Sequence, residues 1–125
     1  MDNKKIVLAI DDNATQLQEY KTVLIPTYDL RVVKSASEAI GFLNKNKSDI
    51  ILLDIEMPNI SGFEFLADIR KIPSYLKVPI IIVSGNSGKD FFEQARNSSA
   101  ADVLSKPVKG EVLITAIEKF LTEQN

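Results

Sequence analysis

The stretch of sequence that decides the fold is DIILLDIEMP, residues 49–58. Four large apolar residues stand between two aspartates. Such a continuous run is typical of a strand buried on both faces in the middle of a parallel sheet. Asp54 closes the run, and Pro58, Asn59 and Gly62 predict a loop directly after it. Because open α/β sheets bind ligands beyond the carboxyl ends of their strands, Asp54 is the first candidate for a functional residue.

Apolar runs and helical spacings alternate along the rest of the chain. Further strands are predicted at residues 5–10, 29–34, 78–83 and 102–105, and the polar run 29–34 is expected near a sheet edge. The first helix is expected between a cap at Asp12 or Asn13 and Pro26, and the second begins at a capping box formed by Ser35 and Glu38. Later helices are predicted at residues 62–71, about 89–97 and about 109–122, with a loop at 74–77.

This alternation predicts an α/β fold. Right-handed crossovers between parallel strands favour a flavodoxin-like, doubly wound, five-stranded parallel sheet in the order 2-1-3-4-5, with five helices on its two faces. A chain of 125 residues is expected to form a single domain, residues 1–125.

Spacing also predicts which helical side chains face the core. Phe92 and Ala95 are expected inward, as is a broad apolar face of the last helix made by Val112, Leu113, Ala116, Ile117, Phe120 and Leu121. Phe63, Phe92 and Phe120 are assigned to the core or to a partner surface. Phe91 and Tyr75 are candidates for a docking face if they are exposed.

Composition excludes several classes of chemistry. The chain has no histidine and no cysteine, so imidazole and thiolate catalysis and the corresponding metal sites are excluded. The net charge of −2 gives no reason to expect nucleic acid as a direct partner. With no apolar span, no signal-peptide pattern and no cysteine, we expect a cytoplasmic protein without membrane contact.

Chemically active side chains stand where the predicted strands end. They are Asp11, Asp12, Asp54, Ser84 and Lys106. Taken singly, each has a simpler interpretation as a helix cap, a turn residue or a solvated charge. In a parallel sheet, however, the carboxyl ends of the strands share one edge, so we expect these side chains to converge there.

Three carboxylates in one crevice need compensating positive charge. Two unit charges ~4 Å apart repel by roughly 4 kcal/mol at an effective dielectric constant near 20. Lys106 offsets part of this repulsion, and a hard divalent cation such as Mg²⁺ or Ca²⁺, which prefers oxygen ligands, would offset the rest. Beside Lys106 and the Ser84 hydroxyl, such a cation makes a site for a phosphoryl group, with a carboxylate as its acceptor.

The ordered motifs resemble the receiver domain of two-component response regulators over essentially the whole chain. They are Asp11-Asp12, Asp54 followed by Met57-Pro58 and Gly62, Ser84-Gly85, and Lys106-Pro107. The resemblance implies that Asp54 accepts a phosphoryl group from a histidine kinase or a histidine phosphotransfer protein. It also implies Mg²⁺ binding by Asp12, Asp54 and the backbone carbonyl of Glu56, with Asp11 acting through water.

The resemblance carries further implications for the switch. Ser84 and Lys106 would bind phosphoryl oxygens and shift on activation, and the Lys106-Pro107 peptide would be cis. Glu56 and Asn86 lie where the family tunes the lifetime of the phosphate. Val103 stands where receivers commonly carry an aromatic switch residue, so the usual aromatic readout is in doubt.

The same resemblance implies a switch module and not an enzyme acting on other substrates. Its partners would be the phosphodonor and a downstream effector protein or domain. It would be a monomer or a weak, phosphorylation-dependent dimer.

Three alternatives remain at this point. Val103 leaves open a receiver-like interaction domain that is not phosphorylated. A haloacid-dehalogenase-like phosphatase also uses an aspartyl nucleophile, but its Asp-x-Asp pair is matched only by Asp54-Ile55-Glu56, and 125 residues leave no room for a cap domain. In a flavodoxin, Asp11 and Asp12 would place negative charge where the flavin phosphate sits.

Overall fold

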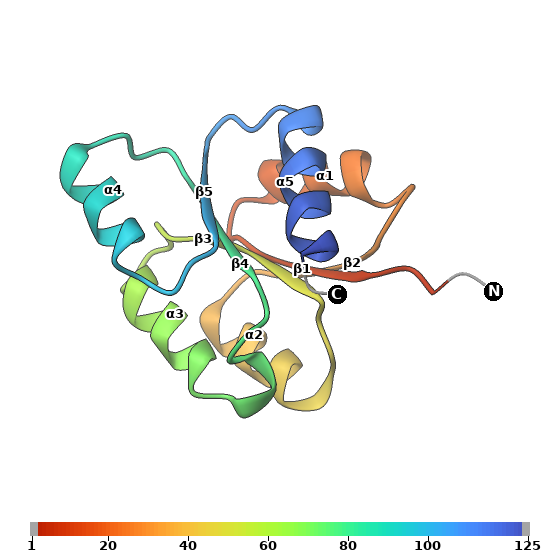
Figure 1. The fold of residues 1–125 in the computed structure, drawn as a ribbon, viewed down its shortest axis with the longest axis horizontal. Coiled ribbons are helices and arrows are strands. Elements are labelled where there is room, and N and C mark those ends of the chain that lie inside the picture. Colours follow the sequence, from red (N-terminus) through yellow and green to blue (C-terminus); the bar gives the residue numbers. More distant parts are fainter. Residues whose placement is uncertain (1–2, 124–125) are drawn as a thin grey trace.

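The computed structural model describes residues 3–123, in which five strands alternate with five α-helices (Figure 1). The strands are β1 Ile6–Ile10, β2 Asp29–Val33, β3 Ile50–Asp54, β4 Ile80–Ser84 and β5 Asp102–Ser105. The helices are α1 Ala14–Leu24, α2 Ala36–Lys45, α3 Gly62–Arg70, α4 Lys89–Arg96 and α5 Gly110–Thr122. A short 3-10 helix, η1 Pro73–Tyr75, occupies part of the segment predicted as a loop.

The sheet has the predicted topology. All strand pairs are parallel and the order is β2-β1-β3-β4-β5, so the predicted fold class and strand order are confirmed. The polar strand β2 lies at an edge, whereas every residue of β3 and β4 is buried. Strand β4 begins at Ile80, two residues later than predicted. Pro79 lacks an N–H and contributes only its carbonyl, which accepts a hydrogen bond from Ile51 at 3.0 Å.

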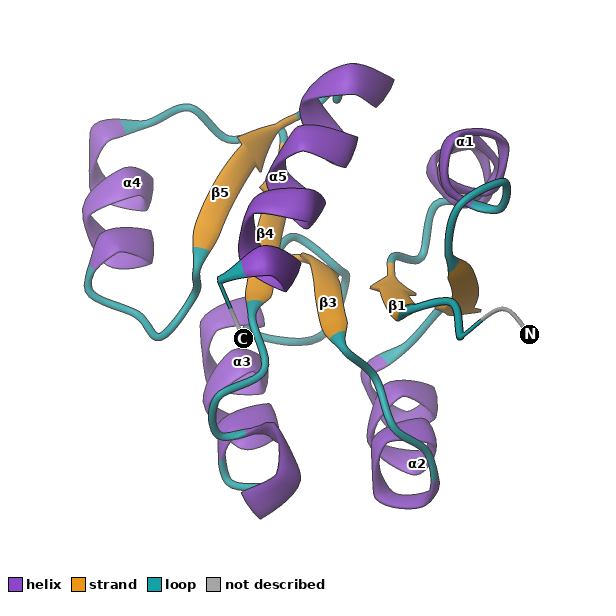
Figure 2. Cartoon of the chain, turned by 45° about the vertical axis from the view of Figure 1, so that its right-hand side comes forward, coloured by secondary structure: helices purple, strands orange, loops and turns teal. Residues whose placement is uncertain are grey.

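Two apolar layers cover the sheet (Figures 1 and 2). Helices α1 and α5 pack on one face, where Leu17, Leu24, Leu113 and Ile117 are buried against alternate strand residues. Helices α2, α3 and α4 cover the other face, and Phe65 and Ile69 of α3 are buried there. Since both faces are covered, the central strands are apolar throughout, and polar side chains are left for the strand ends.

Side-chain caps fix where helices α1, α2 and α3 begin, and Ser61 caps α3 by accepting the Glu64 N–H at 3.4 Å. The Asn13 side chain accepts the Gln16 N–H at 3.0 Å, so Asn13 and not Asp12 caps α1. This leaves the Asp12 carboxylate available at the end of β1. Ser35 caps α2 by accepting the Glu38 N–H at 3.1 Å.

Helix rotation differs from the prediction at several positions. In α4, Phe91 is buried and Phe92 is only half-buried, because Phe91 shares a face with Ala95 and lies 5.9 Å from the ring of Phe63. The inward position of Ala95 is confirmed, and Phe92, which was also expected inward, packs against the core but is only partly buried. Val112 was expected on the inward apolar face of α5, and that position is wrong. Its side chain is 46% exposed, because α5 turns Leu113, Ala116 and Ile117 toward the sheet.

The proposed docking role of Phe91 and Tyr75 depended on their exposure, which the structure contradicts. Both side chains are buried. The Tyr75 hydroxyl donates to the backbone carbonyl of Asn46 at 2.5 Å, which ties η1 to the end of α2. Tyr75 therefore belongs to the core and not to a free surface.

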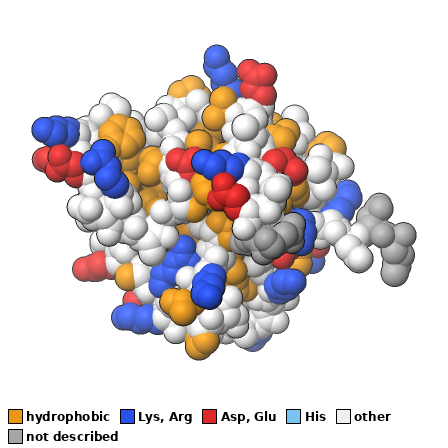
Figure 3. Space-filling model, in the orientation of Figure 1, with side chains coloured by type: hydrophobic (Ala, Val, Ile, Leu, Met, Phe, Trp, Pro, Cys, Tyr) orange, Lys and Arg blue, Asp and Glu red, His pale blue; other side chains and the backbone are white. Residues whose placement is uncertain are grey.

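Charges are mixed on the face shown in Figure 3. Acidic and basic side chains lie side by side over much of it, with small apolar areas between them. A mixed pattern gives this face no strong field of one sign. Among residues 3–123, no helix combines the length and the apolar character needed to cross a bilayer.

Candidate functional site

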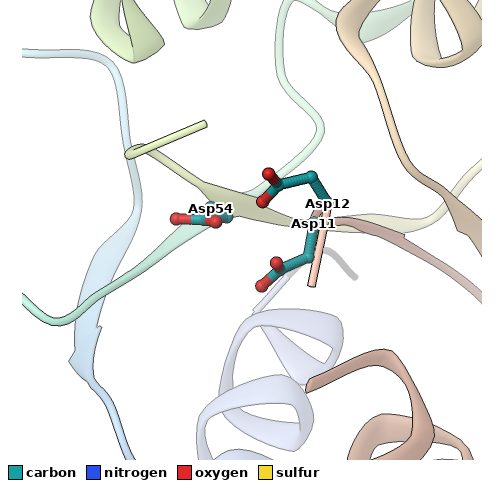
Figure 4. A group of neighbouring side chains, drawn as sticks. All are labelled: Asp11, Asp12 and Asp54. Carbon is teal, nitrogen blue, oxygen red and sulfur yellow. The ribbon is translucent and has the colours of Figure 1, made fainter. Parts of the chain in front are cut away.

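The carboxyl ends of the strands bring the predicted acids together. Asp11 directly follows β1, and Asp54 is the last residue of the neighbouring strand β3 (Figure 4). The Asp11 N–H donates to the Val33 carbonyl at 3.1 Å, which continues the β1–β2 pairing and fixes the side chain at the sheet edge. Asp11 is fully buried and Asp54 is 5% exposed, so both residues are shielded from solvent at this edge of the sheet.

The three acids form a group suited to a hard cation. Asp11, Asp12 and Asp54 each offer a carboxylate oxygen, and these oxygens all lie within 4.8 Å of one another. Asp12 is exposed, so the group is open to solvent on one side. Oxygen donors at this spacing, with one open side, fit Mg²⁺, which binds through one or two carboxylates and keeps several waters.

Lys106 provides positive charge at this edge. Its N–H donates to the Ser84 carbonyl at 2.8 Å, and the Lys106-Pro107 peptide is cis, as the resemblance implies. The ammonium Nζ lies 3.1 Å from Asp11 Oδ2 and 3.4 Å from Asp54 Oδ2. Burial lowers the pKa of Lys106, but its hydrogen bonds and charge pairing with the two aspartates raise that pKa above its ordinary value.

The surroundings of Asp54 make its charged form costly. Burial, together with the charge of Asp11, raises the pKa of Asp54, while the Glu56 N–H, donated to Asp54 Oδ1 at 3.0 Å, and Lys106 oppose the rise. Burial and the negative charges of Asp11 and Asp54 likewise raise the pKa of the nearby Tyr20 hydroxyl. The crevice thus carries more negative charge than Lys106 neutralises.

Ser84 ends β4 and is almost fully buried. Its hydroxyl donates to Glu56 Oε1 at 2.9 Å, and the Gly85 N–H donates to the same oxygen at 3.1 Å. The Asn86 N–H donates to Ser84 Oγ at 2.9 Å, which orients the hydroxyl. The turn after β4 is therefore bonded to the loop after β3 through one carboxylate.

A close backbone approach holds the loop that follows Asp54. A Cβ on Gly62 would lie 2.3 Å from the Ile55 carbonyl oxygen, so only glycine fits at the start of α3. Met57 is buried beneath this loop, and Asn59 takes a left-handed conformation with φ of 66°. These features fix the backbone that carries Glu56.

Two other predicted site residues do not reach the acids. The Asn86 side chain accepts the Gly88 N–H at 2.8 Å in the exposed turn before α4. Val103 pairs with Ile82 in the sheet and packs, half-buried, against the core. Neither forms a hydrogen bond or ion pair with Asp54 in the described part of the chain.

Sequence reasoning missed two neighbours of the site. Tyr20 of α1 is buried, and burial together with the charges of Asp11 and Asp54 raises its pKa, but no motif in the sequence singles it out. The Glu56 carboxylate was likewise not expected on Ser84, because the two residues are 28 positions apart and no pattern links them.

Fold and site together define a flavodoxin-like α/β domain whose carboxyl edge gathers acids, a hydroxyl and an amine. The sequence model of the response regulator receiver domain family matches residues 7–118, and the chain therefore belongs to this family. It is the receiver domain of a two-component response regulator.

Known proteins place the chain in context. It is 36% identical, over 98% of its length, to protein-glutamate methylesterase/protein-glutamine glutaminase 2 of Pseudomonas syringae, but covers only 34% of that protein. It is 26% identical to protein PilH of Pseudomonas aeruginosa, covering 92% of this chain and 96% of PilH. The chemotaxis protein CheY4 of Vibrio cholerae superimposes with a TM-score of 0.87 at 25% identity, over 94% of this chain and 98% of CheY4. The chain spans about a third of the length of the methylesterases that it matches.

Proposed function

We propose that Asp54 accepts a phosphoryl group and that this modification switches the binding of a partner. The observation that carries the proposal is the ion pair between Lys106 Nζ and Asp54 Oδ2, at 3.4 Å beside two further carboxylates. An amine and a hydroxyl next to a nucleophilic carboxylate are suited to stabilising the oxygens of a transferring phosphoryl group.

The donor is a phosphohistidine of a histidine kinase or a histidine phosphotransfer protein. A carboxylate oxygen of Asp54 attacks phosphorus and forms a P–O bond. The P–N bond of the donor breaks, and its electron pair remains on the imidazole nitrogen. Lys106 and the Ser84 hydroxyl hold the phosphoryl oxygens, so charge that develops in the transition state is already matched by donors.

The metal group would be Mg²⁺, held by Asp12, Asp54 and the backbone carbonyl of Glu56, with Asp11 acting through water. When bound, Mg²⁺ neutralises negative charge on the carboxylates and on the phosphoryl oxygens. Asp12, which is exposed, is suited to admitting the cation, and the buried Asp11 keeps Lys106 directed into the crevice through their 3.1 Å contact.

The output is a change in which partner the domain binds. Phosphorylation biases a pre-existing equilibrium of the Ser84 and Lys106 loops. The domain acts catalytically only on its own phosphorylation and dephosphorylation, and its partners are the phosphodonor and an effector protein or domain, with no direct contact to nucleic acid or membrane. We further propose that residues 1–125 form a single receiver domain, as a monomer or a weak phosphorylation-dependent dimer.

The phosphatase alternative has less support. It needs a second acid that serves the nucleophile, and the nearest match is Glu56. The Glu56 carboxylate instead accepts hydrogen bonds from Ser84 and Gly85.

The proposal is tested with acetyl phosphate and Mg²⁺ as a small phosphodonor. Intact-protein mass spectrometry is expected to show the addition of one phosphoryl group to the wild type, and no addition to Asp54→Ala or after Mg²⁺ is chelated. Asp49→Ala is the matched control, because Asp49 directly precedes the strand that Asp54 ends. An unmodified wild type, or equal modification of Asp54→Ala, would contradict the proposal.

A further inference from the structure

A carboxylate of the protein fills a small anion-binding site beside Asp54. The Ser84 hydroxyl and the Gly85 N–H converge on one oxygen, Glu56 Oε1, at 2.9 and 3.1 Å. Donors that converge on a single anionic oxygen form the kind of concavity that binds phosphate oxygens. In this structure the anion is supplied by the chain itself.

The main chain ties this internal anion to the acceptor of the proposed phosphorylation. The Glu56 N–H donates to Asp54 Oδ1 at 3.0 Å. Asp54 pairs with Val83 across the β3–β4 ladder, so Ser84 immediately follows the residue opposite Asp54. A phosphoryl group on Asp54 would therefore lie beside the donors that hold the Glu56 carboxylate.

The charge of Glu56 is balanced only by those donors within the described residues 3–123. Lys106 pairs with Asp11 and Asp54, and no Lys or Arg of this range forms an ion pair with Glu56. Glu56 is exposed, so its side chain has room to turn into water. A doubly charged phosphoryl group nearby would repel the carboxylate toward that solvated position.

We propose that Glu56 is a positioning residue that competes internally with the phosphoryl group. Its carboxylate holds the Ser84 hydroxyl and the Gly85 N–H in the resting domain, and it leaves them when Asp54 is phosphorylated. This inference rests on the proposed phosphorylation of Asp54. It assigns to the side chain of Glu56 a role distinct from that of its backbone carbonyl.

The first test measures binding of beryllium fluoride, a phosphoryl mimic, in the presence of Mg²⁺. Glu56→Ala removes the competitor and is expected to lower the half-saturating concentration about tenfold, the effect of losing one or two hydrogen bonds to a charged group. Glu56→Gln keeps an acceptor oxygen but loses the charge, so its shift is expected to be smaller and in the same direction. Glu93→Gln removes a charge from an exposed position on α4 and is expected to bind as the wild type does.

The second test follows the amide proton of Gly85 by NMR without beryllium fluoride or Mg²⁺. Its resonance is expected to move upfield in Glu56→Ala, because the bond to the carboxylate is lost, and to stay unchanged in Glu93→Gln. Wild-type affinity or weaker affinity in both Glu56 variants, or an unmoved Gly85 resonance, would overturn the inference and leave the proposed function intact. A wild type that binds no beryllium fluoride would overturn both.

Discussion

The two ends of strand β3 each carry an aspartate, and the two residues have opposite surroundings. Asp49, just before the strand, accepts the Ile6 N–H at 2.7 Å and lies 3.6 Å from the ammonium of Lys47, whose side chain is 79% exposed. Asp54, at the other end, is 5% exposed and shares Lys106 with Asp11. Each acid thus accepts one backbone N–H, but Asp49 pairs with an exposed lysine, whereas the buried Asp54 shares Lys106 with a second carboxylate.

The two edges of the sheet differ in the same way. At the amino edge, the Ser48 hydroxyl donates to the Ile50 carbonyl at 2.8 Å, and the Tyr75 hydroxyl donates to the Asn46 carbonyl. Each of these polar side chains therefore satisfies one backbone acceptor. At the carboxyl edge, polar side chains face one another and leave excess negative charge. Such an arrangement contributes little to folding and much to binding a cation or a phosphoryl group.

Of the variants that test the contrast between the two edges of the sheet, Lys106→Met should have the largest effect on phosphorylation. It removes the ammonium that lies 3.1 Å from Asp11 and 3.4 Å from Asp54, so the initial rate of phosphorylation by acetyl phosphate should fall by about 10²- to 10³-fold. Affinity for Mg²⁺ should rise, because the carboxylates lose their competing cation. Lys47→Met, at the amino edge, is the control and should change neither quantity; equal losses in both variants would remove the distinction between the edges.

Gly62→Ala tests how firmly the loop at the carboxyl edge is held. The added Cβ would lie 2.3 Å from the Ile55 carbonyl oxygen, so the free energy of unfolding should fall by about 1–3 kcal/mol in urea denaturation. Gly41→Ala is the matched control. It has open space around the new methyl group within α2 and should raise stability by about 0.5–1 kcal/mol. If Gly62→Ala were neutral, the close approach would not constrain the loop.

Asp49→Ala should affect stability without affecting chemistry. The Ile6 N–H loses its 2.7 Å acceptor, so the free energy of unfolding should fall by about 1 kcal/mol while phosphorylation of Asp54 continues at the wild-type rate. Thermal denaturation and the mass-spectrometric assay together measure both effects. A loss of phosphorylation with unchanged stability would reverse the roles assigned to the two ends of β3.

Asp54→Asn should give the smallest effect, an increase in stability that depends on pH. Burial raises the pKa of Asp54 in the folded state above its ordinary value of 3.8. Between the ordinary pKa of the unfolded chain and the raised pKa of the folded state, the folded protein therefore binds more protons than the unfolded chain. The free energy of unfolding falls as the pH rises through this window. The variant cannot ionise, so it should be more stable than the wild type at pH 7 without Mg²⁺.

The gain from Asp54→Asn should shrink as the pH falls through the folded pKa toward 3.8. Urea denaturation of the wild type and of Asp54→Asn at several pH values measures the difference. A variant less stable than the wild type at pH 7 would mean that the pairing of Asp54 with Lys106 outweighs the cost of its burial.

The sequence alone predicted the order of strands and helices, the edge position of β2 and the residues that stand at the strand ends. These features follow from local signals, since an unbroken apolar run fits only a strand covered on both faces, and caps such as Ser35 mark helix starts. Once the strands are parallel, their carboxyl ends must share an edge. That geometric consequence is enough to predict that Asp11, Asp54 and Lys106 lie together, as their ion pairs show.

Only the tertiary structure decided how individual side chains are oriented. Whether Phe91 or Phe92 is buried depends on a small rotation of α4 against α3, and both residues satisfy the same helical spacing. The bond between Glu56 and Ser84 depends on two loops from different strands meeting at 2.9 Å. Local patterns carry no information about such contacts, because packing between distant segments sets them.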